Sequence, residues 1–221
     1  MELLVNQCRV GMASATGKEN VSSGTYASTA DFERIFTEDM SGLYLLSLLL
    51  TGDPDRAEEC FVAGVGEATK GNRVFKQWAR SWARRTIVQC AIRMVTPQQR
   101  SGRTTRDPAS PRGLDDVPSA LEAEARAILE LAPLERFVFV MSVLERYSEH
   151  DCSILLRCSR RDVAAVLDRA LQHLGSLMNF HKHEADASSE GLSDPHTSRL
   201  VIAMTIARNF ATSGWNTNLS A

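Results

Sequence analysis

Two adjacent arginines, Arg160 and Arg161, follow a serine at the point where the chain is expected to enter a helix. Ser159 can accept hydrogen bonds from the first free backbone N–H groups, which makes it the expected N-cap. The two arginines then lie on the first exposed turn, and Arg169 lies further along the same helix. Guanidinium groups placed in this way can pair with guanine edges or with phosphates in a DNA groove. Ser159, Arg160, Arg161 and Arg169 are therefore predicted DNA contacts.

These residues belong to a stretch, Ser148 to Leu174, that is predicted to form two helices joined by a tight turn. Apolar residues recur at intervals of three and four in both halves, so each helix has one buried face. They are Cys152, Leu155 and Leu156 in the first half, and Val163, Val166, Leu167, Ala170, Leu171 and Leu174 in the second. A helix-turn-helix commonly places its second helix in the major groove. An αα-hairpin inside a helical bundle has the same pattern, so this stretch alone leaves both interpretations open.

A second group of basic residues lies in residues 70–112, a strongly cationic segment of a chain with formal net charge −2. Lys76, Arg80 and Arg84 are spaced by four and line one face of a predicted helix, and two tryptophans line a neighbouring face. Cations beside aromatic rings suit single-stranded DNA, since a base stacked on a ring contributes about 1–3 kcal/mol. The predicted contacts are Asn72, Arg73, Lys76, Arg80, Trp82, Arg84 and Arg85. The alternative is that the tryptophans are core residues and the arginines form a solvated face.

Acidic residues are concentrated upstream of this cationic segment. They are Asp31, Glu33, Glu38, Asp39, Asp53, Asp55, Glu58, Glu59 and Glu67. Such charge asymmetry predicts a polyanion on one surface of the protein and a basic partner on another.

The predicted fold class is all-α, because the apolar spacing is helical almost throughout and strand signals are nearly absent. Two small helical domains are expected, at residues 30–95 and 120–178, each near the lower size limit for independent folding. Residues 96–119 contain four prolines, two glycines and no apolar periodicity. They are predicted to form a flexible basic linker.

The remaining segments offer few signals. Residues 1–29 are expected to be a disordered leader and not a signal peptide. Residues 179–221 are expected to be a polar tail with one weak helix, Arg199 to Phe210, to which no role is assigned. The longest uncharged apolar run, Leu43 to Leu50, is too short to span a bilayer. No membrane contact and a cytoplasmic location are therefore expected.

Upstream of the helix-turn-helix, Leu121 to Tyr147 supplies two more predicted helices, the second of which is opened by Pro133. The run L-A-P-L-E-R-F-V-F-V-M-S-V-L-E-R-Y-S, followed by a helix-turn-helix and V-x-x-x-L-x-R-A-L-x-x-L, resembles region 4 of the extracytoplasmic-function sigma factors of bacterial RNA polymerase. In that family this domain binds the −35 element of promoters.

An independent block, Asp31 to Val95, resembles region 2 of the same family. Its first apolar helix is expected to run from Phe32 through Leu50, and T-G-D-P-D-R-A-E-E-C-F-V, starting at Thr51, resembles the start of the family's second helix. Val74 to Val95 resembles the third helix, which in that family opens and holds the −10 element. By this resemblance the predicted polymerase contacts are Asp55, Glu58, Glu59 and Val62.

The resemblance implies a divergent transcription initiation factor of sigma type. Its partners would be core RNA polymerase, promoter DNA and, where one exists, an anti-sigma protein. Three departures weaken this interpretation: Val62 stands at the family's glutamine position, Arg157 replaces the usual turn glycine, and residues 164–166 replace a lysine-serine-arginine run. They favour the alternative of a sigma-like interaction regulator that has lost promoter recognition. A plain helix-turn-helix repressor would not explain the amino-terminal block.

Catalytic and metal-binding motifs are missing from the sequence. It contains no glycine-rich phosphate loop, no G-x-S-x-G and no H-E-x-x-H. No enzymatic activity, cofactor or metal is therefore expected. The five cysteines form no C-x-x-C pair. Cys60, Cys90 and Cys152 fall on apolar helix faces and are expected to be buried thiols.

Overall fold

The computed structural model describes residues 25–70, 73–95, 119–183, 195–213 and 215. Within these ranges the chain is helical, and one isolated antiparallel bridge pairs Tyr26 with Phe75. The predicted all-α class is therefore confirmed. Nearly all of the predicted leader and linker, together with Asn72, lies outside the described residues.

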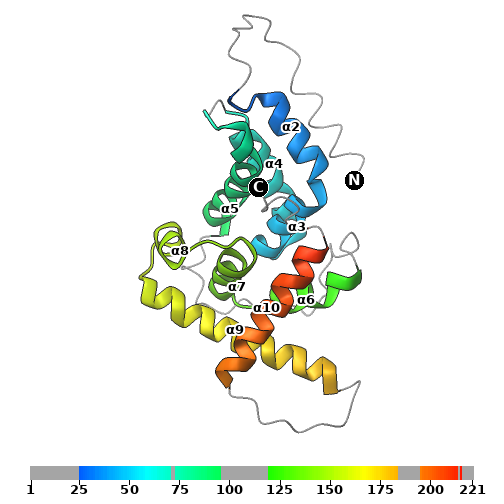
Figure 1. Ribbon diagram of the computed structural model, residues 1–221, viewed down its shortest axis with the longest axis vertical. Coiled ribbons are helices and arrows are strands. Elements are labelled where there is room, and N and C mark those ends of the chain that lie inside the picture. The colour runs from blue at the N-terminus through cyan, green and yellow to red at the C-terminus, as the bar shows by residue number, and fades with distance from the viewer. Residues whose placement is uncertain (1–24, 71–72, 96–118, 184–194, 214, 216–221) are drawn as a thin grey trace, which may run out of the picture.

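The helices form two packed groups that follow one another along the chain (Figure 1). The first group contains α2 (Thr29–Glu38), α3 (Met40–Thr51), α4 (Pro54–Ala68), the 3-10 turn η1 (Lys76–Trp78) and α5 (Ala79–Val95). The second contains α6 (Ser119–Glu130), α7 (Pro133–Phe139), the π-helical turn η2 (Val140–Leu144), α8 (Glu149–Leu156) and α9 (Arg160–His183). The last helix, α10 (Pro195–Thr212), crosses α9 and reaches towards α6.

Two expected helix boundaries are wrong. The apolar helix expected from Phe32 through Leu50 is broken at Asp39, where φ is −109° and ψ is 26°. The break lets α2 bury one face only, whereas α3 is buried on nearly all sides. The third helix begins at Ala79 and not at Val74, because η1 precedes it. Lys76 therefore lies outside the α-helix that carries Arg80.

Among the described residues, one hydrophobic core runs through both helix groups. Arg136 of α7 is only 3% exposed, and its guanidinium crosses between the groups. Nη2 donates to the backbone oxygens of Leu50 (3.4 Å) and Thr51 (3.2 Å) at the end of α3. Nη1 donates to the backbone oxygen of Leu129 at 3.2 Å. Buried carbonyl groups need such donors, so Arg136 fixes α7 against α3.

The turn after α3 depends on glycine. Gly52 has φ of 73°, in the left-handed region, and a Cβ atom there would lie 2.5 Å from Arg136 Nη2. We expect Gly52→Ala to lower the free energy of unfolding by about 2 kcal/mol, because it adds backbone strain and displaces a buried guanidinium. Urea unfolding of the full chain measures this.

A matched control for the turn is Gly66→Ala in α4, where a Cβ would meet nothing within 4 Å. Alanine is the better helix former by about 0.5–1 kcal/mol, so this variant should be slightly more stable than the natural chain. If both variants were equally stable, Gly52 would not be required for the contact between α3 and Arg136.

Candidate nucleic-acid interface

The two helices and the tight turn expected from the sequence are present as α8, a turn and α9. Ser148 caps α8 by accepting from the backbone N–H of Asp151 at 3.1 Å. The helix ends at Arg157, whose φ of 54° and ψ of 43° lie in the left-handed region. The turn therefore keeps the conformation that glycine favours, although arginine adopts it at a cost of about 1–2 kcal/mol.

Ser159 is the N-cap of α9, as predicted. Its Oγ accepts from the backbone N–H of Asp162 (3.1 Å) and donates to Asp162 Oδ2 (2.7 Å). Asp162 in turn accepts from the Ser159 backbone N–H at 3.1 Å, which completes a capping box. These bonds lower the pKa of the Asp162 carboxyl. The Ser159 side chain is thus engaged in the cap and starts α9 at a fixed residue.

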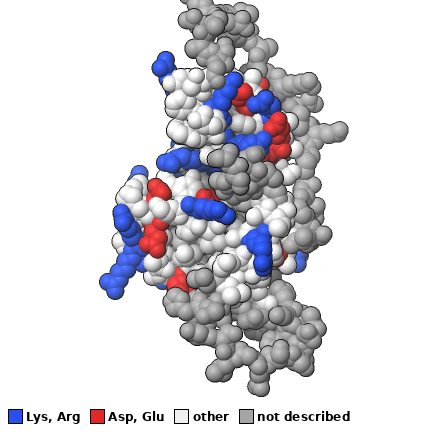
Figure 2. Space-filling view, in the orientation of Figure 1, with Lys and Arg blue, Asp and Glu red and all other residues white. Residues whose placement is uncertain are grey.

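The predicted arginines lie on the solvent side of α9. Val163, Val166, Ala170 and Leu174 are buried on the opposite side, as the periodicity predicts. Arg160 and Arg161 are both exposed. Figure 2 shows basic side chains projecting from the molecule at the edge where α9 begins. Their position leaves the first turn of α9 accessible to a large partner.

Two of the predicted arginines on α9 also contact neighbouring elements. Arg160 Nη2 lies 2.9 Å from His150 Nδ1 on α8. Arg169 Nε lies 3.6 Å from Glu135 Oε1, and its side chain remains 58% exposed. His173 shares the same carboxylate at 3.0 Å. Arg169 therefore ties α9 to α7 while its outer surface stays in solvent.

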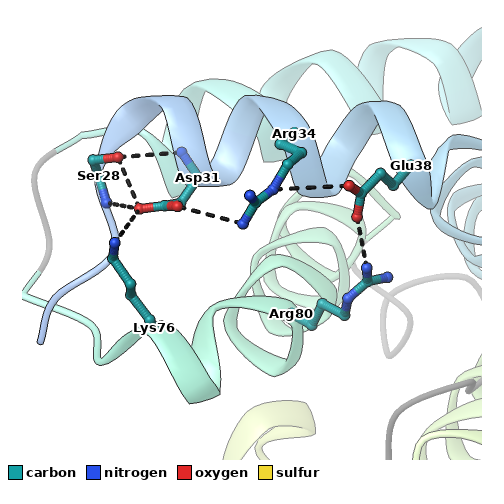
Figure 3. Close-up of polar contacts among 6 residues, drawn as sticks. All are labelled: Ser28, Asp31, Arg34, Glu38, Lys76 and Arg80. Carbon is teal, nitrogen blue, oxygen red and sulfur yellow. Dashed lines mark hydrogen bonds and ion pairs between the residues drawn. The ribbon is translucent and has the colours of Figure 1, made fainter. Parts of the chain in front are cut away.

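The acidic and basic segments pair with each other across α2, η1 and α5 (Figure 3). Lys76 Nζ lies 3.6 Å from Asp31 Oδ2, and Arg80 Nη2 lies 2.8 Å from Glu38 Oε2. Arg34 bridges the same two acids. Figure 2 shows this mixture of charges on the surface over α2. Asp31 and Glu38, two of the acids expected to face a basic partner, are thus paired with cations of the same chain. Exposed pairs of this kind contribute about 0–1 kcal/mol each, so a phosphate can displace them.

Arg84 is buried, with 8% of its surface exposed, and lies between the two helix groups. Glu145, just after η2, accepts charge-assisted hydrogen bonds from Nε (2.9 and 3.2 Å) and from Nη2 (2.6 Å). Asp39 lies 3.5 Å from Nη1, and the Trp215 ring centroid is 4.7 Å from Cζ. Burial by itself lowers the pKa of Arg84, but Glu145 and Asp39 raise it overall. Arg84 is therefore charged. In this conformation its side chain is buried.

A cleft of about 470 Å³ opens beside Arg84, between the two helix groups. It is lined by Asp39, Arg73, Val74, Phe75, Trp78, Arg80, Ser81, Trp82, Arg84, Arg85, Glu145, Arg146, Tyr147 and Trp215. Five of the predicted single-strand contacts, all except Asn72 and Lys76, thus share one cleft. Trp78 is 58% exposed and Trp82 is half-buried, so the core interpretation of the tryptophans does not hold for Trp78. Burial raises the pKa of Tyr147 to about 12, so its hydroxyl stays protonated at neutral pH.

The predicted polymerase contacts share one exposed face of α4. Asp55, Glu58, Glu59 and Val62 all point to solvent, and Val62 is 45% exposed. The opposite face buries Ala57, Cys60, Phe61 and Gly64. Asp53 caps the helix by accepting from the Arg56 N–H at 3.0 Å, and Pro54 occupies its first turn. The face therefore combines acidic side chains with one apolar residue.

Two residues of the cleft, Glu145 and Trp215, were not among the predicted site residues. Glu145 was matched only as part of a family pattern, and Trp215 lies in a polar stretch that received no role. The available signals were a carboxylate directly after the apolar run that ends at Leu144, and a single large aromatic side chain in an otherwise polar tail. The tail helix was expected from Arg199 to Phe210, and α10 contains that range.

The thiols match their prediction, since Cys60, Cys90 and Cys152 are buried. Burial raises the pKa of Cys60 to about 12. The described ranges hold no group of three or more His, Cys, Asp or Glu side chains that could bind a metal ion. Among the helices that the structure describes, none is long and apolar enough to cross a membrane.

Comparison with known proteins assigns no family to the chain. No protein-family model, no curated protein and no solved structure matches it.

Proposed function

We propose that this protein is a DNA-binding transcription initiation factor of sigma type, which directs core RNA polymerase to promoters. The observation that carries the proposal is the α8–α9 unit, whose second helix starts at a capped residue and exposes Arg160 and Arg161 on its first turn. This is the part of a recognition helix that contacts base edges in the major groove. The unit would bind the −35 element.

The cleft supplies the second half of the proposed activity. Arg73 and Arg85 are exposed at the cleft and can bind phosphates, and the ring of Trp78 is available for stacking on a base. Cationic side chains with aromatic rings bind single strands with little dependence on sequence. In the proposed mechanism this cleft holds one strand of the opened −10 element, while the exposed face of α4 binds core polymerase.

One observation favours a second candidate, a sigma-like interaction regulator without promoter recognition. Ala164 and Ala165 occupy exposed positions on α9, so two positions expected to face a DNA groove carry no polar or charged group. On α8, the other helix of the unit, Ile154 is 59% exposed. Exposed apolar side chains on both helices suit a protein partner as well as a DNA groove.

Transcription in vitro with core polymerase and a library of genomic promoters tests the proposal. We expect the full chain to produce specific transcripts. We expect Glu58→Lys with Glu59→Lys to abolish them and to weaken polymerase binding at least about tenfold, because like charges would replace complementary ones at the interface. Binding is measured without DNA by co-purification from a defined mixture.

The matched control reverses Glu130 and Glu149, which are exposed on α6 and α8 and change the net charge equally. It should bind polymerase as the natural chain does. Polymerase binding without any specific transcript would favour the interaction regulator. Equal binding by the α4 variant and the control would exclude α4 as the docking face.

A further inference from the structure

Arg84 is contacted by an anion and an aromatic ring, the two kinds of group that a bound nucleotide would also present to it. Glu145 presents two carboxylate oxygens to Nε and Nη2 of the guanidinium, at 2.9 and 2.6 Å, in the bidentate geometry that arginine also uses for phosphate. Trp215 places its ring centroid 4.7 Å from Cζ, in the place where a stacked base would lie. An anion and an aromatic ring thus reach Arg84 from the carboxy-terminal half of the chain.

These contacts are built into the fold. Glu145 is 61 residues from Arg84 in sequence, and its side chain is only 5% exposed. Trp215 is 4% exposed and packs edge-on against Phe210 of α10, with ring centroids 5.1 Å apart. The tail helix, through Phe210, therefore determines where the Trp215 ring lies. Displacement of α10 would therefore move the Trp215 ring away from Arg84.

We propose that Glu145 and Trp215 form an autoinhibitory latch that withholds Arg84 from single-stranded DNA. This inference rests on the proposed function, since it concerns the regulation of the cleft assigned to the −10 strand. In the latched form the cleft offers only its outer cations, among them Arg73 and Arg85. Release of the latch gives Arg84 a phosphate and a base in place of Glu145 and Trp215.

Arg84 must exchange Glu145 and Trp215 directly for groups of the DNA, because its guanidinium is buried and needs a compensating partner. A buried charge that loses its partner is strongly destabilising, whereas one that changes partners keeps its electrostatic compensation. DNA held first by the outer arginines can supply the new anion to Arg84. A polymerase surface that displaces α10 would favour the same exchange.

Fluorescence anisotropy of a labelled single-stranded oligonucleotide, titrated with the full chain, tests the latch. We expect Trp215→Ala to bind at least about tenfold more tightly, because it raises the fraction of protein in the binding-competent state. The matched control is Trp78→Ala, the same change at an exposed ring of the same cleft, which should weaken binding. Hydrogen exchange around Arg84 should be faster in Trp215→Ala than in the natural chain, with or without DNA.

Glu145→Gln provides a second measurement if loss of the Trp215 ring impairs folding. It keeps the side-chain volume and removes one anion, while Asp39, 3.5 Å from Nη1, still compensates the guanidinium, and it should also tighten DNA binding. In an Arg84→Gln background, neither change should have any effect on DNA affinity. If the natural chain binds single-stranded DNA and neither latch variant binds it more tightly, the latch is overturned and the proposed function stands. If no form binds single-stranded DNA at low salt, both are overturned.

Discussion

Replacement of Arg136 by leucine is expected to lower the free energy of unfolding by about 3 kcal/mol or more. The guanidinium is buried and donates to the backbone oxygens of Leu50, Thr51 and Leu129. Each buried carbonyl that loses its donor costs about 1–3 kcal/mol, and leucine supplies none. The lost hydrogen bonds include those that join α7 to the end of α3. The two helix groups should then unfold less cooperatively in urea, which circular dichroism measures.

The control for this prediction is Arg126→Leu on α6. Arg126 is exposed and makes one ion pair with Glu122 a turn earlier, at 2.5 Å. Such a pair is worth about 0.3–0.5 kcal/mol. A loss of stability at Arg136 no larger than at Arg126 would mean that the helix groups are not joined through this guanidinium.

The parts of the fold that the sequence predicted are those determined by local signals. The α8–α9 unit was predicted because its apolar spacing and its cap at Ser159 both lie within a few residues of the boundary they define. Pro133 marked the start of α7 for the same reason. The break at Asp39 was missed, because apolar residues continue on both sides of it and periodicity alone does not separate two consecutive helices.

The candidate site was harder to predict because its charges are neutralised by residues distant in sequence. Spacing placed Lys76, Arg80 and Arg84 on one face, but it could not show that Glu38 and Glu145 would meet two of them. Net charge along a segment measures composition, whereas availability to a ligand depends on pairing in three dimensions. In the part of the cationic segment that the structure describes, the arginines therefore line a cleft and are partly engaged by acidic side chains.

The α8–α9 unit, in contrast, keeps Arg160 and Arg161 exposed, and replacing both is the second change expected to have a large effect. Arg160→Ala with Arg161→Ala is expected to reduce affinity for a preferred duplex by about 10- to 100-fold, since a bidentate arginine–guanine pair discriminates by about 1–3 kcal/mol. Helical circular dichroism should not change, because both side chains are exposed. Selection from random duplexes by the full chain, natural against double variant, measures affinity and sequence preference together.

The control is Arg34→Ala with Arg126→Ala, which removes the same charge from exposed positions on α2 and α6. It should leave the selected motif unchanged, whereas the variant in α9 should blur it. Loss of affinity without loss of motif would assign Arg160 and Arg161 to phosphates, and the salt dependence would then fall by about one unit of log–log slope per arginine. If the natural chain enriches no motif at moderate salt, promoter recognition by α9 is wrong. The exposed side chains of Ile154, Ala164 and Ala165 would then be better explained as contacts for a protein partner.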